Sequence, residues 1–297
     1  MKKVLVVGSC ILCCMLFLTG CGEKKTKKKI GVVMSSLATQ FDLDLKEGIE
    51  KQAAEYGYDV VVLDSDDQKQ IETQNISKMT NLGISAVILD PVDVDLSVSS
   101  IEKLTKKSIP IVVVNQQLTK TKEMKLLSTV LSNEEDGGRI AGEYLLSLIG
   151  PKTRVIEMEG PATSKVTEQR HDGFHHAVDG DISIIATRNM EYDRATALSE
   201  METLLISNGQ FDGVFAQNDE IAIGAAEALE HAGMTNVKIV GMDATTDGIN
   251  ALENGKIAGT IAKQPKEIGQ TAVRNLYDHF SGKDVSESTL IDFKLIK

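Results

Sequence analysis

Short runs rich in Val, Ile and Leu alternate with amphipathic stretches from residue 30 onward, and no other feature of the sequence constrains the fold as strongly. This alternation is typical of βαβ units, which place their strands side by side in parallel sheets. The predicted strands are residues 30–34, 60–63, 86–89, 111–114, 127–131, 154–158, 182–186, 213–215, 239–242 and 257–261. The predicted helices are residues 43–56, 71–82, 95–107, 136–149, 166–177, 194–207, 220–231 and 246–254. The sequence therefore predicts two doubly wound α/β sheets in tandem.

The N-terminal segment predicts export and lipidation. Lys2 and Lys3 precede the apolar residues 4–18, a stretch of roughly fifteen residues that suits a signal peptide better than a membrane span of roughly twenty. Leu18-Thr19-Gly20-Cys21 then matches a lipobox, in which the cysteine thiol receives a diacylglycerol. We expect a signal peptide at 1–20, a lipidated Cys21 with a tether at 21–27, and an extracytoplasmic protein anchored to the membrane. An uncleaved anchor helix is the alternative.

Cysteine content and charge exclude several classes of function. All cysteines lie in or next to the predicted signal peptide, at Cys10, Cys13, Cys14 and Cys21. Beyond them the chain has no disulfide, no cysteine nucleophile and no thiolate metal site. The formal net charge of −11 disfavours nucleic acid as a partner.

Polar residues follow several predicted strands directly. Asn115 and Gln116 follow one strand, Asn218 lies just after another, and Asp243 follows a third. Ligands of open parallel sheets bind outside the carboxyl ends of the strands, where short polar side chains can hold ligand hydroxyls. Asn and Asp are also common helix N-caps, so the local sequence leaves binding and capping both open.

Three segments then show a resemblance: residues 61–65 (VVLDS), 215–220 (FAQNDE), and Gly255-Lys256 with residues 260–262 (TIA). From about residue 29 to the C-terminus the chain resembles the bacterial ribose-binding proteins. The resemblance implies a type I periplasmic binding protein: two Rossmann-like lobes joined by a three-stranded hinge. It implies an N-terminal lobe of 28–131 plus 264–291 and a C-terminal lobe of 132–263 plus 292–297.

The same resemblance implies the function. Such a protein closes its lobes around a monosaccharide or related polyol and delivers it to an ABC permease, without a cofactor and as a monomer. An extracellular sugar receptor that feeds a sensor kinase or a chemoreceptor is the alternative. A repressor of the same superfamily is not expected, because the signal peptide stands where its DNA-binding helices would be.

The resemblance also implies ligand-binding residues. Phe41 and Tyr192 correspond to aromatic residues that sandwich the sugar ring, and Arg170 corresponds to an arginine that forks onto sugar oxygens. Asn218 and Asp243 match ligand-binding residues, which favours binding over capping at these two positions.

Three departures from the ribose-binding pattern disfavour ribose itself. Asn115-Gln116 replaces an Asp-Arg pair, Asp42 replaces a phenylalanine, and Lys263 replaces a glutamine. We expect Asp42 and Lys263 to face the same cleft, where they either pair with each other, the favoured hypothesis, or leave Lys263 to meet an anionic or amino-modified ligand.

Other candidate chemistry is sparse. His171 and His175 have a metal-ligand spacing on a predicted helix, with His176 beside them, but a solvated helix face is the favoured interpretation. Glu157 and Glu159 share one face of a strand without an assigned acid or base role. We therefore expect no metal and no enzymatic activity.

Overall fold

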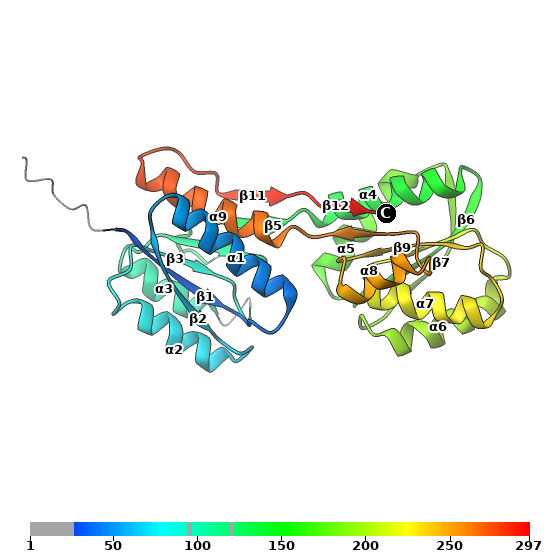
Figure 1. The fold of residues 1–297 in the computed structure, drawn as a ribbon, viewed down its shortest axis with the longest axis horizontal. Helices are drawn as coiled ribbons and strands as arrows, with labels where there is room; N and C mark the ends of the chain where they lie inside the picture. The colour runs from blue at the N-terminus through cyan, green and yellow to red at the C-terminus, as the bar shows by residue number, and fades with distance from the viewer. Residues whose placement is uncertain (1–26, 94–96, 119–120) are drawn as a thin grey trace, which may run out of the picture.

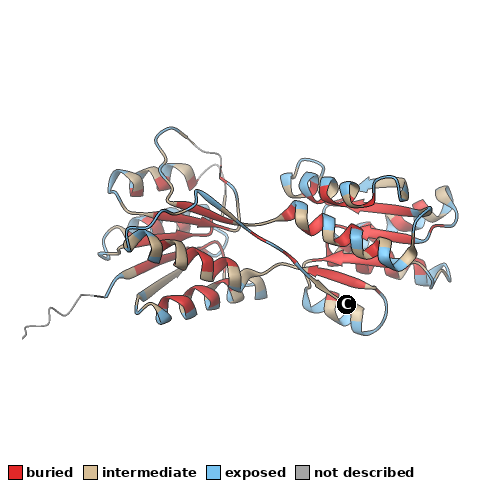
Figure 2. Cartoon of the chain, turned by 90° about the horizontal axis from the view of Figure 1, so that it is seen from above, coloured by how far each residue is buried: buried red, intermediate tan, exposed pale blue. Residues whose placement is uncertain are grey.

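The computed structural model describes residues 27–93, 97–118 and 121–297. The predicted signal peptide and Cys21 lie outside the described residues. The chain forms two α/β lobes that lie end to end along the long axis of the molecule (Figure 1). In each lobe, buried strands lie between helices whose outer faces are exposed (Figure 2). Within the described ranges, no helix is long and apolar enough to cross a membrane.

The first lobe is built on a parallel six-stranded sheet with the order β11-β5-β4-β3-β1-β2. Its strands are β1 (Lys29–Met34), β2 (Asp59–Asp64), β3 (Ala86–Leu89), β4 (Ile111–Val114), β5 (Ser128–Ser132) and β11 (Ser288–Ile291). Helices α1 (Gln40–Glu55) and α9 (Pro265–Phe280) pack on one face, and α2 (Lys69–Met79) and α3 (Ser97–Lys106) pack on the other.

The second lobe repeats this order as β12-β10-β9-β8-β6-β7, except that β12 is antiparallel to β10. Its strands are β6 (Thr153–Glu159), β7 (Ile182–Asn189), β8 (Gly213–Ala216), β9 (Lys238–Met242), β10 (Gly259–Ala262) and β12 (Lys294–Ile296). Helices α4 (Glu134–Ile149) and α5 (Lys165–Val178) cover one face, and α6 (Arg194–Asn208), α7 (Asp219–His231) and α8 (Thr246–Glu253) cover the other. The predicted pair of doubly wound α/β lobes is confirmed.

The chain passes between the two sheets three times. It leaves β5 for α4 through Asn133, leaves β10 for α9 through Lys263 and Gln264, and leaves β11 for β12 through Asp292. The passages are hydrogen-bonded to each other, because Asn133 donates its side-chain amide to the Asp292 carboxylate over 3.1 Å and Gln264 donates to the Asp292 carbonyl.

Helix α1 shows how the local sequence positions the edge of the first lobe. Thr39 and Asp42 form a reciprocal capping box that fixes where the helix begins. Leu45, Ile49 and Ala53 follow at helical spacing and are fully buried against the sheet. Because α1 begins at Gln40, Phe41 lies in its first turn, at the carboxyl end of the sheet.

Candidate functional site

A cavity of about 600 Å³ is lined by residues from both lobes, within the range typical of small-molecule sites. The first lobe contributes Thr39, Gln40, Phe41, Asp44 and Pro265, and the second contributes Asp243, Ala244, Thr245, Thr246, Ala262 and Lys263. In each sheet the strand order reverses between the first and third strands, and a crevice at this switch point is where open α/β sheets bind ligands.

Arg170 lies at the centre of the second lobe's polar groups. Its guanidinium is 2% exposed and donates Nε to Glu134 over 2.7 Å, Nη1 to the Gln217 carbonyl and Nη2 to Asp243 over 3.2 Å. Burial disfavours the charge of Arg170, but Asp243 and Glu134 together raise its pKa above the usual value. The arginine is therefore a fixed, permanently charged group.

Glu134 is shared between two cations. Oε2 of Glu134 accepts from Arg170, and Oε1 of Glu134 lies 3.3 Å from Nζ of Lys263. Burial alone would raise the pKa of Glu134, but Arg170 and Lys263 outweigh it and the pKa is lowered. Lys263, Glu134, Arg170 and Asp243 thus form a continuous row of alternating charges, two positive and two negative.

Two glycines allow α4 and α5 to bring Glu134 and Arg170 together. A Cβ on Gly138 would lie 2.0 Å from the Arg170 carbonyl oxygen, and a Cβ on Gly173 would lie 1.8 Å from the Glu135 carbonyl oxygen. Since only glycine permits this approach of the two backbones, the ion pair depends on both positions.

Asp243 stands on a strained loop after β9. Asp243 and Ala244 have φ angles of 96° and 52°, which side chains other than glycine rarely adopt. Asp219 holds the loop by accepting from the Thr245 amide over 2.7 Å and from the Thr245 hydroxyl over 3.0 Å. Its burial raises the pKa of Asp219 to about 6. Strained residues held this way cluster at binding and catalytic sites.

Asn218 caps helix α7, because its side-chain oxygen accepts from the Ile221 amide over 2.8 Å. The capping alternative is therefore found at this position. Capping uses the oxygen alone, and among the described residues no hydrogen bond of the Asn218 amide nitrogen is found. Capping and ligand binding are compatible here.

Tyr192 has a left-handed backbone, with φ of 54°, and its ring rests on the backbone of Gly160. A Cβ on Gly160 would lie 2.1 Å from Cζ of the tyrosine. The hydroxyl of Tyr192 lies 3.2 Å from that of Thr167 in α5. The contact of the ring with Gly160 and the hydrogen bond of its hydroxyl with Thr167 therefore hold the tyrosine side chain in one position.

In the first lobe, Asn115 follows β4 in a left-handed conformation, with φ of 67°, and donates to Asp90 over 3.1 Å. Asp90 follows β3, is fully buried and also accepts from the Ser35 hydroxyl over 2.5 Å. Burial raises the pKa of Asp90 to about 6. Gln116 donates to the Pro91 carbonyl over 2.9 Å and ties the loops after β3 and β4 together.

The predicted pairing of Asp42 with Lys263 is wrong in this structure. Asp42 turns back to cap its own helix, accepting from the Thr39 hydroxyl over 2.7 Å, and Lys263 pairs with Glu134. Lys263 does reach the aromatic ring of the opposite lobe, with Nζ 5.8 Å from the centre of Phe41. Phe41 belongs to the first lobe and Tyr192 to the second, and no contact between them is found among the described residues.

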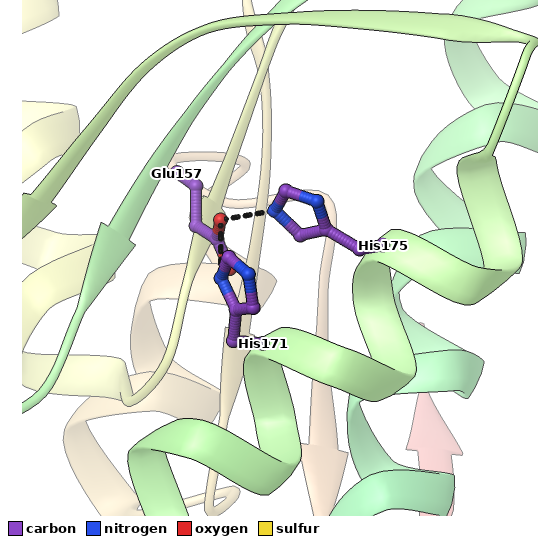
Figure 3. A group of neighbouring side chains, drawn as sticks. All are labelled: Glu157, His171 and His175. Carbon is purple, nitrogen blue, oxygen red and sulfur yellow. Dashed lines mark hydrogen bonds and ion pairs between the residues drawn. The ribbon is translucent and has the colours of Figure 1, made fainter.

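The predicted solvated face at His171 and His175 is also wrong. Both imidazoles are about one-third exposed and face β6 (Figure 3). His171 lies 2.6 Å from Glu159 and 3.2 Å from Glu157, and His175 lies 2.8 Å from Glu157. The reason is that α5 packs on the sheet with the side that carries these two residues, so only His176 points outward.

Sequence reasoning missed three carboxylates of the site. Asp90 directly follows β3 and could have been found by the rule that identified Asn115. Asp219 lies inside the segment 215–220 that drew attention to Asn218. Glu134 carried no sequence signal, because it precedes Arg170 by many residues and meets it only through the packing of α4 on α5.

Comparisons with known proteins agree with this fold. Residues 30–284 match the periplasmic binding protein domain family. The ribose import binding protein RbsB of Escherichia coli (strain K12) is 33% identical over 297 residues, which cover 100% of this chain and 98% of that protein. The D-apiose import binding protein of Actinobacillus succinogenes is 28% identical over 274 residues, covering 90% of this chain and 87% of that protein.

Among solved structures, a periplasmic solute binding protein of an ABC transporter from Actinobacillus succinogenes 130z, with bound D-allose, superposes with a TM-score of 0.76. It is 25% identical, and the match covers 91% of this chain and 98% of that one. These relatives bind solutes for importers and are not enzymes.

Proposed function

The chain belongs to the family of periplasmic binding proteins, and we propose that it captures a monosaccharide or related small polyol between its lobes for delivery to an ABC importer. It is an extracytoplasmic solute-binding protein and not an enzyme. Import is proposed over sensing because the curated relatives named above are import binding proteins.

One observation carries the proposal: the buried Arg170 is held between two carboxylates, and one of them, Asp243, lines the cavity to which both lobes contribute. Hydrogen bonds from such charged groups contribute about 1.5 to 3 kcal/mol each. The two positive and two negative charges in the row of Lys263, Glu134, Arg170 and Asp243 sum to zero. The site therefore favours a neutral ligand that both donates and accepts hydrogen bonds. A polyol has this chemistry.

The ligand-binding residues that we propose come from both lobes. The second lobe supplies Arg170, Tyr192, Asn218, Asp243 and Lys263, and the first supplies Phe41, Asp42, Asn115 and Gln116. The rings of Phe41 and Tyr192 would cover the two apolar faces of the sugar when the lobes approach.

We propose closure about the three passages between the sheets, with residues 28–131 plus 264–291 moving against 132–263 plus 292–297. The support is that the passages are few and bonded to one another, as at Asn133 and Asp292. A ligand that touches both lobes stabilises only the closed arrangement and so shifts the population toward it.

Membrane anchoring through Cys21 is also a proposal and rests on the lipobox. Acyl chains contribute about 0.8 kcal/mol for each buried methylene, and two chains suffice for stable attachment. Globomycin, which blocks the lipoprotein signal peptidase, and Cys21→Ser should each prevent formation of the lipidated mature protein in cell fractions. Normal maturation of Cys21→Ser would contradict the anchor.

The function is tested by calorimetry and thermal unfolding with pentoses, hexoses, inositols, acidic sugars and amino sugars. A ligand at 100 times its dissociation constant should stabilise the protein by about 2.7 kcal/mol. Asp243→Asn should weaken capture, while Glu143→Gln, at an exposed pair with Arg139, should leave it unchanged. If no member of the panel binds, or if Asp243→Asn binds like the wild type, the proposed site is wrong.

A further inference from the structure

A second group of chemically active side chains lies on the second lobe, between α5 and β6 (Figure 3). His171 and His175 are four residues apart, so their imidazoles lie on the same face of the helix, with ring centres 3.8 Å apart. Nδ1 of His171 and Nε2 of His175 both point to the same Glu157 oxygen, at 3.2 Å and 2.8 Å. These three groups place their potential ligand atoms within 4.8 Å of one another.

Glu157 itself provides independent evidence that a ligand belongs here. Its side chain is completely buried, and Oε1 has no hydrogen-bond partner among the described residues. Buried carboxylate oxygens are normally paired, and an unpaired one needs an explanation such as an ion. In the part of the chain that the structure describes, no Lys or Arg pairs with this carboxylate, and its ion-pair partners are the two imidazoles of α5.

A second carboxylate lies beside the same nitrogen of His171 and could also contact an ion there. Glu159, two residues further along β6, lies 2.6 Å from Nδ1 of His171. Its other oxygen accepts from the Asn189 amide of β7 over 2.7 Å, which fixes the carboxylate in place. Metal sites commonly hold their ligands in this way through hydrogen bonds from neighbouring side chains.

We propose that Glu157, His171 and His175 bind one divalent transition-metal ion of the class of Zn²⁺, with Glu159 or water completing the coordination. Two imidazole nitrogens and a carboxylate suit Zn²⁺, Ni²⁺ or Cu²⁺ and do not suit Mg²⁺ or Ca²⁺. Tetrahedral bonds of about 2.0 to 2.2 Å separate ligand atoms by roughly 3.3 to 3.6 Å, so a small rotation of the side chains opens the group to that size.

Such an ion would cross-link α5 to β6 next to Arg170, the residue that precedes His171. The expected consequence is a stiffer second lobe that unfolds at a higher temperature. The site is separate from the cavity that both lobes line, so it goes beyond the proposed sugar-binding function and does not depend on it.

The test is calorimetric titration of the full chain with Zn²⁺ at neutral pH, in protein whose cysteines are alkylated so that no thiolate competes. All four cysteines lie within residues 1–21, so alkylation touches no described residue. We expect one ion per chain, a higher unfolding temperature, and a loss of affinity of about 100-fold in His175→Gln and in Glu157→Gln. His176→Gln is the matched control, since this neighbouring imidazole is 76% exposed and faces outward, and it should bind like the wild type.

Co²⁺ provides a second readout, because tetrahedral coordination by nitrogen and oxygen gives intense visible absorption that solvated Co²⁺ lacks. His171→Gln should remove this absorption while circular dichroism shows an intact fold. The proposal is overturned if the wild type binds neither ion at about 100 μM, or if His175→Gln binds Zn²⁺ with wild-type affinity. A wild-type protein that binds Zn²⁺ but binds none of the sugars would count against the proposed function alone and would not affect the proposed metal site.

Discussion

Nε of Arg170 lies 2.7 Å from Oε2 of Glu134, and both side chains are buried. The pair joins α5 to α4 and extends on either side to Asp243 and Lys263. A buried ion pair contributes little net stability by itself, but breaking it leaves an uncompensated charge. We therefore expect the pair to act mainly by fixing the guanidinium against Asp243, which lines the cavity.

Arg170→Lys keeps the charge but cannot make the three directed bonds of the guanidinium to Glu134, Asp243 and the Gln217 carbonyl. We expect a loss of about 1–3 kcal/mol in the free energy of unfolding, measured by urea denaturation. Sugar affinity should fall at least about tenfold in calorimetry. Arg139→Lys is the control, because Arg139 sits in an exposed ion-pair cluster and should change stability by less than about 1 kcal/mol.

Lys263→Gln tests whether the ligand is neutral. Because Glu134 already balances the charge of Lys263, we expect the affinity for a neutral sugar to change less than about tenfold. Lys266→Gln is the control, since Lys266 is half exposed and pairs with Asp44 and Glu47 instead. A loss of several orders of magnitude in Lys263→Gln alone would show a direct ionic contact with an anionic ligand.

Gly160→Ala tests the support of the aromatic ring. The new methyl group would lie 2.1 Å from Cζ of Tyr192, so the ring must move. We expect a loss of about 1–3 kcal/mol in unfolding free energy and weaker sugar binding. In a Tyr192→Ala background the same substitution should cost much less, because the clashing ring is absent. Equal costs in both backgrounds would show that the ring does not rest on Gly160.

Asp90→Asn tests the buried carboxyl group beneath Asn115. Folding raises the pKa of Asp90 from 3.8 to about 6, so the folded state binds the proton more tightly and the free energy of unfolding falls as pH rises from about 4 to about 6. At 1.36 kcal/mol per pKa unit the loss is about 3 kcal/mol. Asp90→Asn should lack this loss in urea denaturation across that pH range, while the exposed Asp284→Asn should keep it. Identical pH profiles for Asp90→Asn and the wild type would contradict the shift.

The pattern of the chain predicted most strands and helices because their apolar positions are local. Leu45, Ile49 and Ala53 recur at helical spacing, so they predict a helix without any information from the rest of the chain. The elements after residue 262 were not predicted from the pattern. Helix α9 could have been found, because Ile268, Ala272 and Leu276 recur at helical spacing and are buried. Strands β11 and β12 are short and incompletely buried, and their places in the two sheets come from pairing with β5 and β10. Such pairing is a long-range property that no local pattern records.

The candidate site likewise combines features that the local sequence sets with features that only the tertiary packing sets. The sequence by itself determined two α/β lobes and polar residues at the ends of their strands, because periodicity and strand ends are properties of neighbouring residues. Only the tertiary structure decided which charges meet: Lys263 with Glu134 rather than Asp42, and His171 and His175 with Glu157 rather than solvent. These partners lie far apart in the chain, and their distances are set by how α4, α5 and the sheet pack.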